Sequence, residues 1–506
     1  MWNTNQSFPS ESLASQPGRH LVDGTVRVFF AGLLFPLTGL ITAAFLTRRL
    51  GTDGYGLLVL SSTLFGWVEL GINSYFSRPA IKFIGEAKDW LPVGTTLIRL
   101  QFVAGVSGGL LLGLLSFPLG WLLDEPLLGP YLALFAFHIP ISSLAQAHQS
   151  ILVGIGSFRK KAVTNACRWI ARLLLILFLV EMGLSVPGAI LGSLGAALVE
   201  LAVSRRYVRP PFFGKIAIPT RPFYDFGILL CVSSILFLIF SSMGLVMLKI
   251  LGGTLEQAGI YGAAQNLSII PGLFGSSLSP LLLSTVSRLL FEGKTDQAKS
   301  MGLGAMRLVV GLFPFGALIA GAAPEIVTWV FGQSFEPAGP ILGVLIIGAI
   351  AFVMVSVAVV IVTASGAPLF TLYLSIPLVL LVVIGNLVMI PRFGALGAAR
   401  VTALCEGIGA LASLFAIYRL WAIFPPIGTF LRSAVISVLA YTLAVIWPTA
   451  GLLLVIKIGC IGVVIILAYL VLREFSHDEI VLARSFLRRR TVTIEQQKDG
   501  EFEIQG

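Results

Sequence analysis

Fourteen long apolar runs follow one another along the chain, separated by charged residues or by Gly and Pro. A transmembrane helix needs roughly 20 consecutive apolar residues, and each run is long enough to cross a bilayer. Only 11% of the 506 residues are charged, whereas a soluble protein is about a quarter charged. Because little chain remains outside the runs, a large soluble catalytic or ATP-hydrolysing domain is excluded. The predicted fold is an all-α polytopic membrane protein with about 14 transmembrane helices.

The longest polar stretch between the runs divides six predicted helices from eight. The first two predicted helices are Thr25–Leu46 and Leu57–Tyr75. The predicted organisation is a tail at 1–24, a first lobe at 25–203, an inter-lobe loop at 204–224, a second lobe at 225–420, two further helices at 421–472 and a tail at 473–506. In the last tail, apolar residues precede the basic cluster Arg488–Arg490, which predicts an amphipathic helix on the membrane surface.

Lys and Arg outnumber Asp and Glu by 34 to 24. In a membrane protein such an excess marks cytoplasmic loops rather than a nucleic-acid partner. If both termini are cytoplasmic, 28 of the Lys and Arg residues fall on the inner side and 4 on the outer side. We therefore expect a multi-pass protein of the cell (inner) membrane with both termini in the cytoplasm.

A short pattern occurs after the first predicted helix and again after the seventh. Leu50-Gly51 leads to Tyr55-Gly56, and Leu251-Gly252 leads to Tyr261-Gly262. A shift of six helices preserves orientation across the membrane, so the two lobes would be parallel repeats. Such repeats are common in secondary transporters, with the substrate path between the halves. Because Gly and Pro are frequent in membrane helices and Tyr at membrane interfaces, the pattern also has an explanation without a repeat.

No pattern typical of an enzyme is present. Gly293-Lys294-Thr295 ends like a phosphate-binding loop, but the earlier glycine of that motif is missing, since residue 288 is Arg. The four cysteines lie far apart in apolar segments, which favours buried thiols over a disulfide framework or a metal site. We therefore expect no catalytic residues, no metal and no cofactor.

Charged residues in or beside the apolar runs are the candidate binding residues. A charge at the bilayer centre costs about 2.5–3.5 kcal/mol, so such a residue usually faces a cavity or a partner. Guanidinium groups bind phosphate oxygens in pairs, and arginines near cytoplasmic helix ends could cradle a diphosphate. These arginines are Arg27, Arg78, Arg99, Arg168 and Arg172. Arginines at such ends also follow from the positive-inside rule alone, so both interpretations stay open.

Several short stretches follow one another in an order typical of one family. They are Phe45–Tyr55, Glu69–Gly71 with Arg78, Leu152–Arg159, Gly259–Ala264, Pro280 with Phe291–Lys294, Ala323–Gly332 and Pro391–Ala399. In this order they resemble the bacterial polysaccharide and O-antigen (oligosaccharide) flippases of the multidrug/oligosaccharidyl-lipid/polysaccharide exporter superfamily. The resemblance implies two six-helix lobes across a central cleft, followed by two extra helices. It also implies alternating-access transport of an undecaprenyl-diphosphate-linked oligosaccharide from the cytoplasmic to the outer leaflet.

The resemblance also implies roles for polar residues. The five arginines would hold anionic groups, and Glu69 would orient Arg78 or take a proton. Asn73, Gln265 and Asn266 would contact sugar hydroxyls. The partners would be a lipid-linked oligosaccharide, membrane lipids and a glycan polymerase or other assembly proteins. The chain departs from many members at Met243, where no Asp is found nearby, and ion coupling through that position is therefore in doubt.

Three other functions remain open. A cation-coupled small-molecule exporter of the same fold would need a buried acid in the first or seventh predicted helix, and only Asp225, at the start of the seventh, comes near. A non-transporting scaffold for glycan assembly would keep full function in an Arg78→Ala variant. A membrane-embedded glycan polymerase is disfavoured by the short loops on the predicted outer side.

Overall fold

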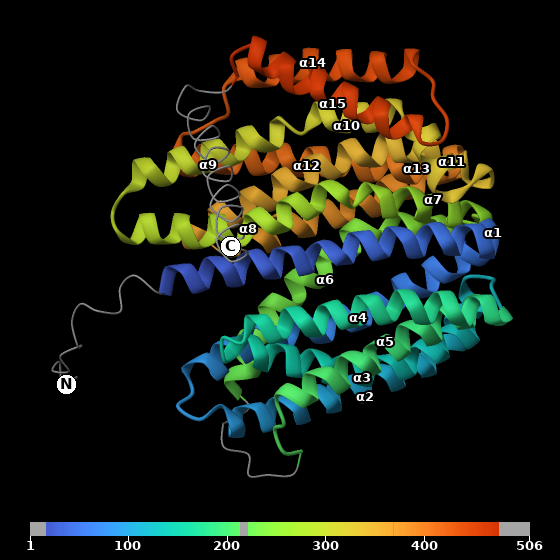
Figure 1. Ribbon diagram of the computed structural model, residues 1–506, viewed down its shortest axis with the longest axis vertical. Coiled ribbons are helices and arrows are strands. Elements are labelled where there is room, and N and C mark those ends of the chain that lie inside the picture. Colours follow the sequence, from blue (N-terminus) through green and yellow to red (C-terminus); the bar gives the residue numbers. More distant parts are fainter. Residues whose placement is uncertain (1–16, 213–220, 368, 475–506) are drawn as a thin grey trace, which may run out of the picture.

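The computed structural model describes residues 17–212, 221–367 and 369–474, with backbone alone at 17–33, 35, 221–230 and 233. Helices form throughout these ranges, and strands are absent from them (Figure 1). Ten helical spans are long and apolar enough to cross a membrane. The chain is a multi-pass membrane protein with an all-α fold, which confirms the predicted fold class. The number of 14 spans stays a prediction, as do the amphipathic tail helix and the ends of both tails, which lie outside the described residues.

The first half of the chain forms one bundle of packed helices, called here the first bundle. It contains α1 (Pro17–Glu86), α2 (Trp90–Leu122), α3 (Leu128–Gly154), α4 (Phe158–Leu179), the π turn η1 (Val180–Leu184) and α5 (Ser185–Tyr207). The helices α4 and α5 run in opposite directions along the bundle. The chain reverses between them at η1, where Gly183 has a φ of 89°.

The second half forms the second bundle and a C-terminal helix pair. The second bundle contains α6 (Arg221–Ile250), α7 (Leu255–Ser268), α8 (Ile270–Phe291), α9 (Thr295–Val310), α10 (Phe313–Gly321), α11 (Ala323–Phe331), η2 (Gln333–Phe335), α12 (Ala338–Ala364) and α13 (Phe370–Trp421). The helix pair is α14 (Ile427–Ile446) and α15 (Leu453–Val471), which packs on α9 and α10.

Two helices are too long to cross the membrane once. A straight α1 of 70 residues would measure about 105 Å, against about 30 Å for the hydrocarbon core. It reverses direction at Gly51, where φ is 69°, and α13 reverses at Gly394, where φ is 53° (Figure 1). Glycine adopts such angles without a Cβ penalty. The predicted loop before the second span is therefore a single non-helical residue, and helix continues past the predicted end at Tyr75 to Glu86.

The two bundles meet through α1, which contacts α6, α7 and α11. We call the end of the molecule with Gly51 and Gly394 the Gly51 end, and the opposite end, with Arg78, the Arg78 end. A Cβ added to Gly56 would lie 2.1 Å from the carbonyl oxygen of Leu255. One added to Gly259 would lie 2.1 Å from that of Thr52. The two copies of the repeated sequence pattern therefore touch backbone to backbone at the Gly51 end.

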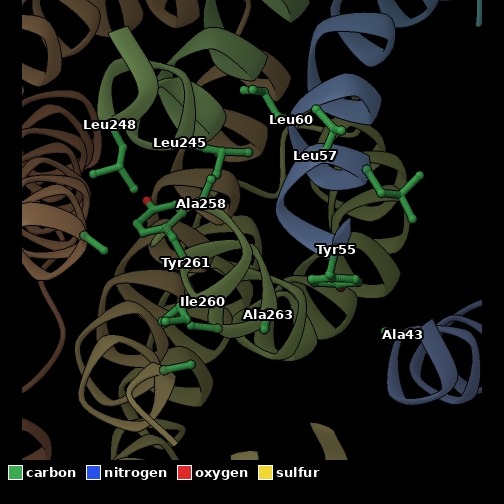
Figure 2. Close-up of a cluster of buried hydrophobic side chains, with 14 of the residues drawn as sticks. Ala43, Tyr55, Leu57, Leu60, Leu245, Leu248, Ala258, Ile260, Tyr261 and Ala263 are labelled. Carbon is green, nitrogen blue, oxygen red and sulfur yellow. The ribbon is translucent and has the colours of Figure 1, made fainter. Parts of the chain in front are cut away.

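Apolar side chains continue this contact inward. The largest buried cluster contains residues of both bundles, and Figure 2 draws part of it. Tyr55 comes from α1, Leu245 and Leu248 from α6, and Tyr261 and Ala263 from α7. Burial of these side chains holds the bundles together at about 25 cal/mol per Å² of apolar surface removed from solvent. Inside a membrane the free energy gained by burying apolar surface is smaller, because lipid is itself apolar. Close packing of side chains then contributes more of the stability.

The C-terminal helix pair is fastened at both ends by charged side chains. At the Gly51 end, the Lys457 ammonium donates to both carboxylate oxygens of Glu325 on α11, at 2.8 and 2.7 Å. At the Arg78 end, Glu474 accepts from Thr429 (2.6 Å), Arg432 (2.7 Å) and Arg307 (3.1 Å). Burial alone would raise the pKa of Glu474, but these three hydrogen bonds outweigh it and hold the pKa below its ordinary value. Lys457, on the last helix, therefore has its partner in the second bundle.

Candidate substrate site in the first bundle

Ionisable side chains converge inside the first bundle from four helices. They are Glu69 on α1, His138 on α3, Arg168 and Arg172 on α4, and Glu200 on α5. Arg168 and Arg172 are four residues apart and share one face of α4. All five lie on segments that span the membrane, where charged groups are retained when they bind a substrate or one another.

Arg168 is already paired. Its Nη1 lies 3.1 Å from Oε2 of Glu200, whose side chain is only 2% exposed. The Arg168 guanidinium also lies over the ring of Trp169, 5.2 Å from the centroid. Because Glu200 neutralises it, Arg168 contributes less free positive charge than the sequence suggested.

Arg172 is different, because no carboxylate neutralises it. Among the described residues its guanidinium has no ion-pair partner, and its buried Nε has no hydrogen-bond acceptor. It lies over the ring of Trp169 at 5.6 Å from the centroid. Arg168 is the neighbouring cation, and Glu69 is the neighbouring acid. An anion placed here would gain a hydrogen-bonding cation that the protein itself leaves unsatisfied.

Glu69 lies beside His138 rather than beside Arg78. Its Oε1 is 4.0 Å from Nδ1 of His138, whose side chain is 4% exposed. Nine residues separate Glu69 from Arg78 along one helix, which is about 13 Å, so direct contact between them is not expected. Phe65 packs edge-on against His138, with centroids 4.9 Å apart, and orients that ring.

Of the two predicted sugar ligands on α7, Asn266 links the two bundles, whereas Gln265 bonds within the second bundle. The Nδ2 of Asn266 donates to the hydroxyl of Tyr55 on α1 at 2.6 Å, and the Asn266 side chain is otherwise exposed. Nε2 of Gln265 donates to the carbonyl of Ser241 on α6 at 3.1 Å. A second link between bundles runs from Nε1 of Trp67 to Oγ of Ser242, at 2.8 Å.

The other predicted ligands lie nearer the Arg78 end. Arg78 is exposed, and Asn73 is half-buried with a buried Oδ1 that lacks a donor among the described residues. Nε of Arg99 donates to the carbonyl of Phe212, so Arg99 holds the chain where it leaves the first bundle. The side chain of Arg27 lies outside the described residues, although its backbone belongs to α1.

Sequence reasoning missed His138 and Glu200. Glu200 lies in an apolar helix among Ala, Leu and Val, and the rule that selected Glu69 would have selected it too. His138 carries no such signal, because a histidine on an apolar helix face is usually a packed core residue. Only its contact with Glu69 singles it out.

The Gly51 end carries two further contacts between helices of different bundles. Nη2 of Arg48 donates to the carbonyl of Trp329 on α11 at 2.7 Å, and Nζ of Lys249 on α6 donates to Glu125 at 2.6 Å. Beside Glu125, a hollow of about 500 Å³ is lined by Phe117, Trp121 and others. It is remote from the charged cluster, and its exposed Trp is typical of a membrane interface.

The fold is two helical bundles that meet mainly along α1, with a cluster of charged side chains inside the first bundle. Several solved structures of membrane proteins share this fold. The lipid II flippase MurJ in an inward closed conformation superposes with a TM-score of 0.66 at 17% identity, covering 92% of this chain and all of that one. The Vibrio cholerae MATE transporter VcmN in the bent form gives 0.57 at 15% identity, covering 83% and 98%. A MOP superfamily transporter from Pyrococcus furiosus gives 0.57 at 14% identity, covering 80% and 96%.

The chain belongs to the family of polysaccharide biosynthesis proteins, whose model matches residues 21–290. A comparison with curated proteins found no match. The fold is the one that these flippase and transporter structures share.

Proposed function

We propose that this protein is a flippase. It moves an undecaprenyl-diphosphate-linked oligosaccharide from the cytoplasmic to the outer leaflet for cell-surface polysaccharide biosynthesis. The observation that carries the proposal is Arg172, a guanidinium inside the first bundle with no carboxylate partner among the described residues. A diphosphate is the group that a bare guanidinium in a membrane interior would bind most strongly, through paired N–H donors.

The neighbours of Arg172 suit a site that binds and then releases an anion. Glu200 pairs with Arg168, so the site keeps one unpaired cation rather than two. Glu69 supplies a nearby negative charge when the site is empty, which limits the cost of burying Arg172. A bound diphosphate would compete with Glu69 for Arg172. Asn73, whose buried Oδ1 has no donor among the described residues, could accept from a sugar hydroxyl.

The orientation follows from the distribution of Lys and Arg. Positive residues gather at the Arg78 end, which the positive-inside rule assigns to the cytoplasm, together with both termini. The Gly51 end would then face outward. There the bundles are in backbone contact at Gly56 and Gly259, and Lys249 pairs with Glu125. This arrangement supports alternating access, with the outer end closed in the state described. The membrane would be the inner membrane, with a glycan polymerase or other assembly proteins as partners.

The test is complementation of a strain that lacks its glycan flippase, with variants at matched expression. We expect wild type to rescue and Arg172→Ala to fail, with Glu69→Gln and Arg78→Ala impaired. Arg400→Ala is the matched control. Arg400 also lies on a spanning helix and over an aromatic ring, 4.9 Å from the Phe393 centroid, but it is in the second bundle. Full rescue by Arg172→Ala would remove the basis of the proposal.

A cation-coupled small-molecule exporter is the second candidate. Glu69 beside His138 favours it, because a half-buried acid in the first bundle could exchange a proton for cargo. Drug accumulation that changes with the ion gradient, without rescue of glycan export, would support this alternative. A scaffold without transport would instead rescue with every one of these variants.

A further inference from the structure

The second bundle contains a buried carboxyl group that the proposed substrate site does not use. Glu406 is 6% exposed and lies 12 residues beyond the Gly394 turn, about 18 Å along the helix and near the middle of that span. Its Oε2 is fully buried and has no hydrogen-bond partner among the described residues. Buried carboxyl groups are usually hydrogen-bonded or paired, so this one requires an explanation.

The helix that packs against Glu406 is shaped to receive it. A Cβ on Gly348 of α12 would lie 2.3 Å from Oε2 of Glu406 and 2.7 Å from Cα of Ala403. Only glycine fits at this crossing. One turn before Glu406 on the same face of α13, Oγ1 of Thr402 lies 3.4 Å from the hydroxyl of Tyr261 on α7.

Among the side chains that the structure describes, no cation balances this carboxyl group. The span α12 carries no charged residue at all. The nearest titratable groups are Cys405 and Tyr261, both of which are neutral acids near pH 7. The remaining described charges on α6, α7 and α13 lie toward helix ends or the Gly394 turn, and they are Lys249, Glu256, Arg392, Arg400 and Arg419. The side chains of Arg221 and Asp225, at the start of α6, are outside the described residues. An ionised Glu406 would therefore be strongly unfavourable in this arrangement.

We propose that Glu406 is a proton-binding site of the second bundle, occupied while the bundles meet at the Gly51 end and vacated when they separate. The proton comes from water and returns to water. In between it forms the O–H bond of the Glu406 carboxylic acid, with no change of oxidation state.

The route from Glu406 to the contact between bundles is short. Tyr261 stands on α7 two residues after Gly259, which touches the backbone of α1. An ionised Glu406 beside α12 and α7 would need contact with water or with a cation. Movement of α7 away from α1 would open the second bundle and let either one enter. Proton binding by Glu406 needs no cargo and does not depend on the proposed flippase function. Only the idea that this proton drives transport rests on that function.

Two measurements on full-length protein in proteoliposomes test this assignment without any cargo. The first is infrared spectroscopy during a pH titration. We expect a protonated-carboxyl band that shifts in D₂O and is lost in Glu406→Gln, but that persists in Glu292→Gln, where an exposed acid paired with Lys294 is removed. Glu406→Asp should keep a titrating band. If Glu406→Gln leaves the wild-type band unchanged, the assignment is overturned.

The second measurement follows the Gly51 end by the distance between spin labels on Leu127→Cys and Ile250→Cys, with the native cysteines replaced. Both positions are exposed, at 57% and 48%, and belong to different bundles. Wild type should show a short distance in acid and gain a longer one in alkaline buffer. Glu406→Gln should keep the short distance throughout. A Glu406→Gln protein with the wild-type pH response would refute the coupling, and it would leave the substrate site of the first bundle untouched.

Discussion

The interiors of the two bundles differ sharply, although both are built from spanning helices of similar length. The first bundle brings Glu69, His138, Arg168, Arg172 and Glu200 together. In the helices α7–α13 of the second bundle, Glu406 is the single buried charged residue that the structure describes. The comparison teaches that the two interiors suit different ligands. A cluster with an unpaired cation suits an anionic cargo, and a lone acid among apolar residues suits a proton.

The two copies of the repeated pattern differ in the same way. Tyr55 reaches across to Asn266 in the other bundle, whereas the hydroxyl of Tyr261 stays within its own bundle beside Thr402. Equivalent tyrosines thus serve contact between bundles in one case and internal packing in the other. The variants below test the contrast in order of expected effect.

The largest effect is expected from Glu200→Ala, because it strands Arg168 inside the first bundle. Loss of one partner of a buried pair costs about 3–5 kcal/mol in the free energy of unfolding. Thermal unfolding in detergent measures this. Glu181→Ala is the control, since its pair with Arg49 is exposed and such pairs contribute about 0–1 kcal/mol. An Arg168→Met/Glu200→Leu double variant should recover most of the loss. Equal losses of stability in Glu200→Ala and Glu181→Ala would show that the first bundle does not depend on its buried pair.

The contact between the bundles should be the next most sensitive. Gly259→Ala places a Cβ against the carbonyl of Thr52 and should cost about 1–3 kcal/mol, the usual range for overpacking. It should also lengthen the distance between spin labels at the Gly51 end. Gly272→Ala, where a Cβ meets nothing within 4 Å, serves as control. An unchanged distance in Gly259→Ala would argue against backbone contact as the closure.

Acid should loosen the C-terminal helix pair. The pKa of Glu474 is lowered, so its contribution is fully present above its ordinary value of 4.5 and is lost as the pH falls from there through the lower folded-state value. Because its partner Arg432 is 41% exposed, we expect about 1 kcal/mol or less. Proteolysis or hydrogen exchange at α14 and α15 should rise in acid in wild type. Glu474→Gln should be weakened already at neutral pH and show less further change, and an identical acid response in both would contradict this assignment.

The smallest stability effect is expected from Glu406→Gln. A neutral carboxylic acid and an amide have nearly the same size, so the free energy of unfolding at neutral pH should change by about 1 kcal/mol or less. The loss of stability in Glu406→Gln should therefore be much smaller than that in Glu200→Ala. This difference distinguishes the unpaired acid Glu406 from the paired acid Glu200. A loss as large as that of Glu200→Ala would mean that Glu406 has a buried cationic partner, and the two interiors would then be alike.

Much of the architecture was predictable from the sequence because membrane spans are read from local hydropathy. The apolar runs predicted the all-α polytopic fold, and the order of short motifs predicted the family. The helix boundaries were less accurate, since helix continues through residues 76–86, which include the charged Arg78, Lys82 and Glu86, at the Arg78 end. Backbone hydrogen bonds within a helix are satisfied equally well outside the membrane, so hydropathy does not mark where such a helix stops.

The sequence by itself determined that this chain spans a membrane, and it predicted that arginines stand near the ends of its spans. Only the tertiary structure decided that Glu200 neutralises Arg168, that Arg99 holds a backbone carbonyl and that Arg172 is left without a carboxylate. The reason is that the energy of a buried charge depends on partners from helices distant in sequence. The hydropathy of a residue depends on that residue alone, and so it cannot reveal which charge is free to bind a substrate.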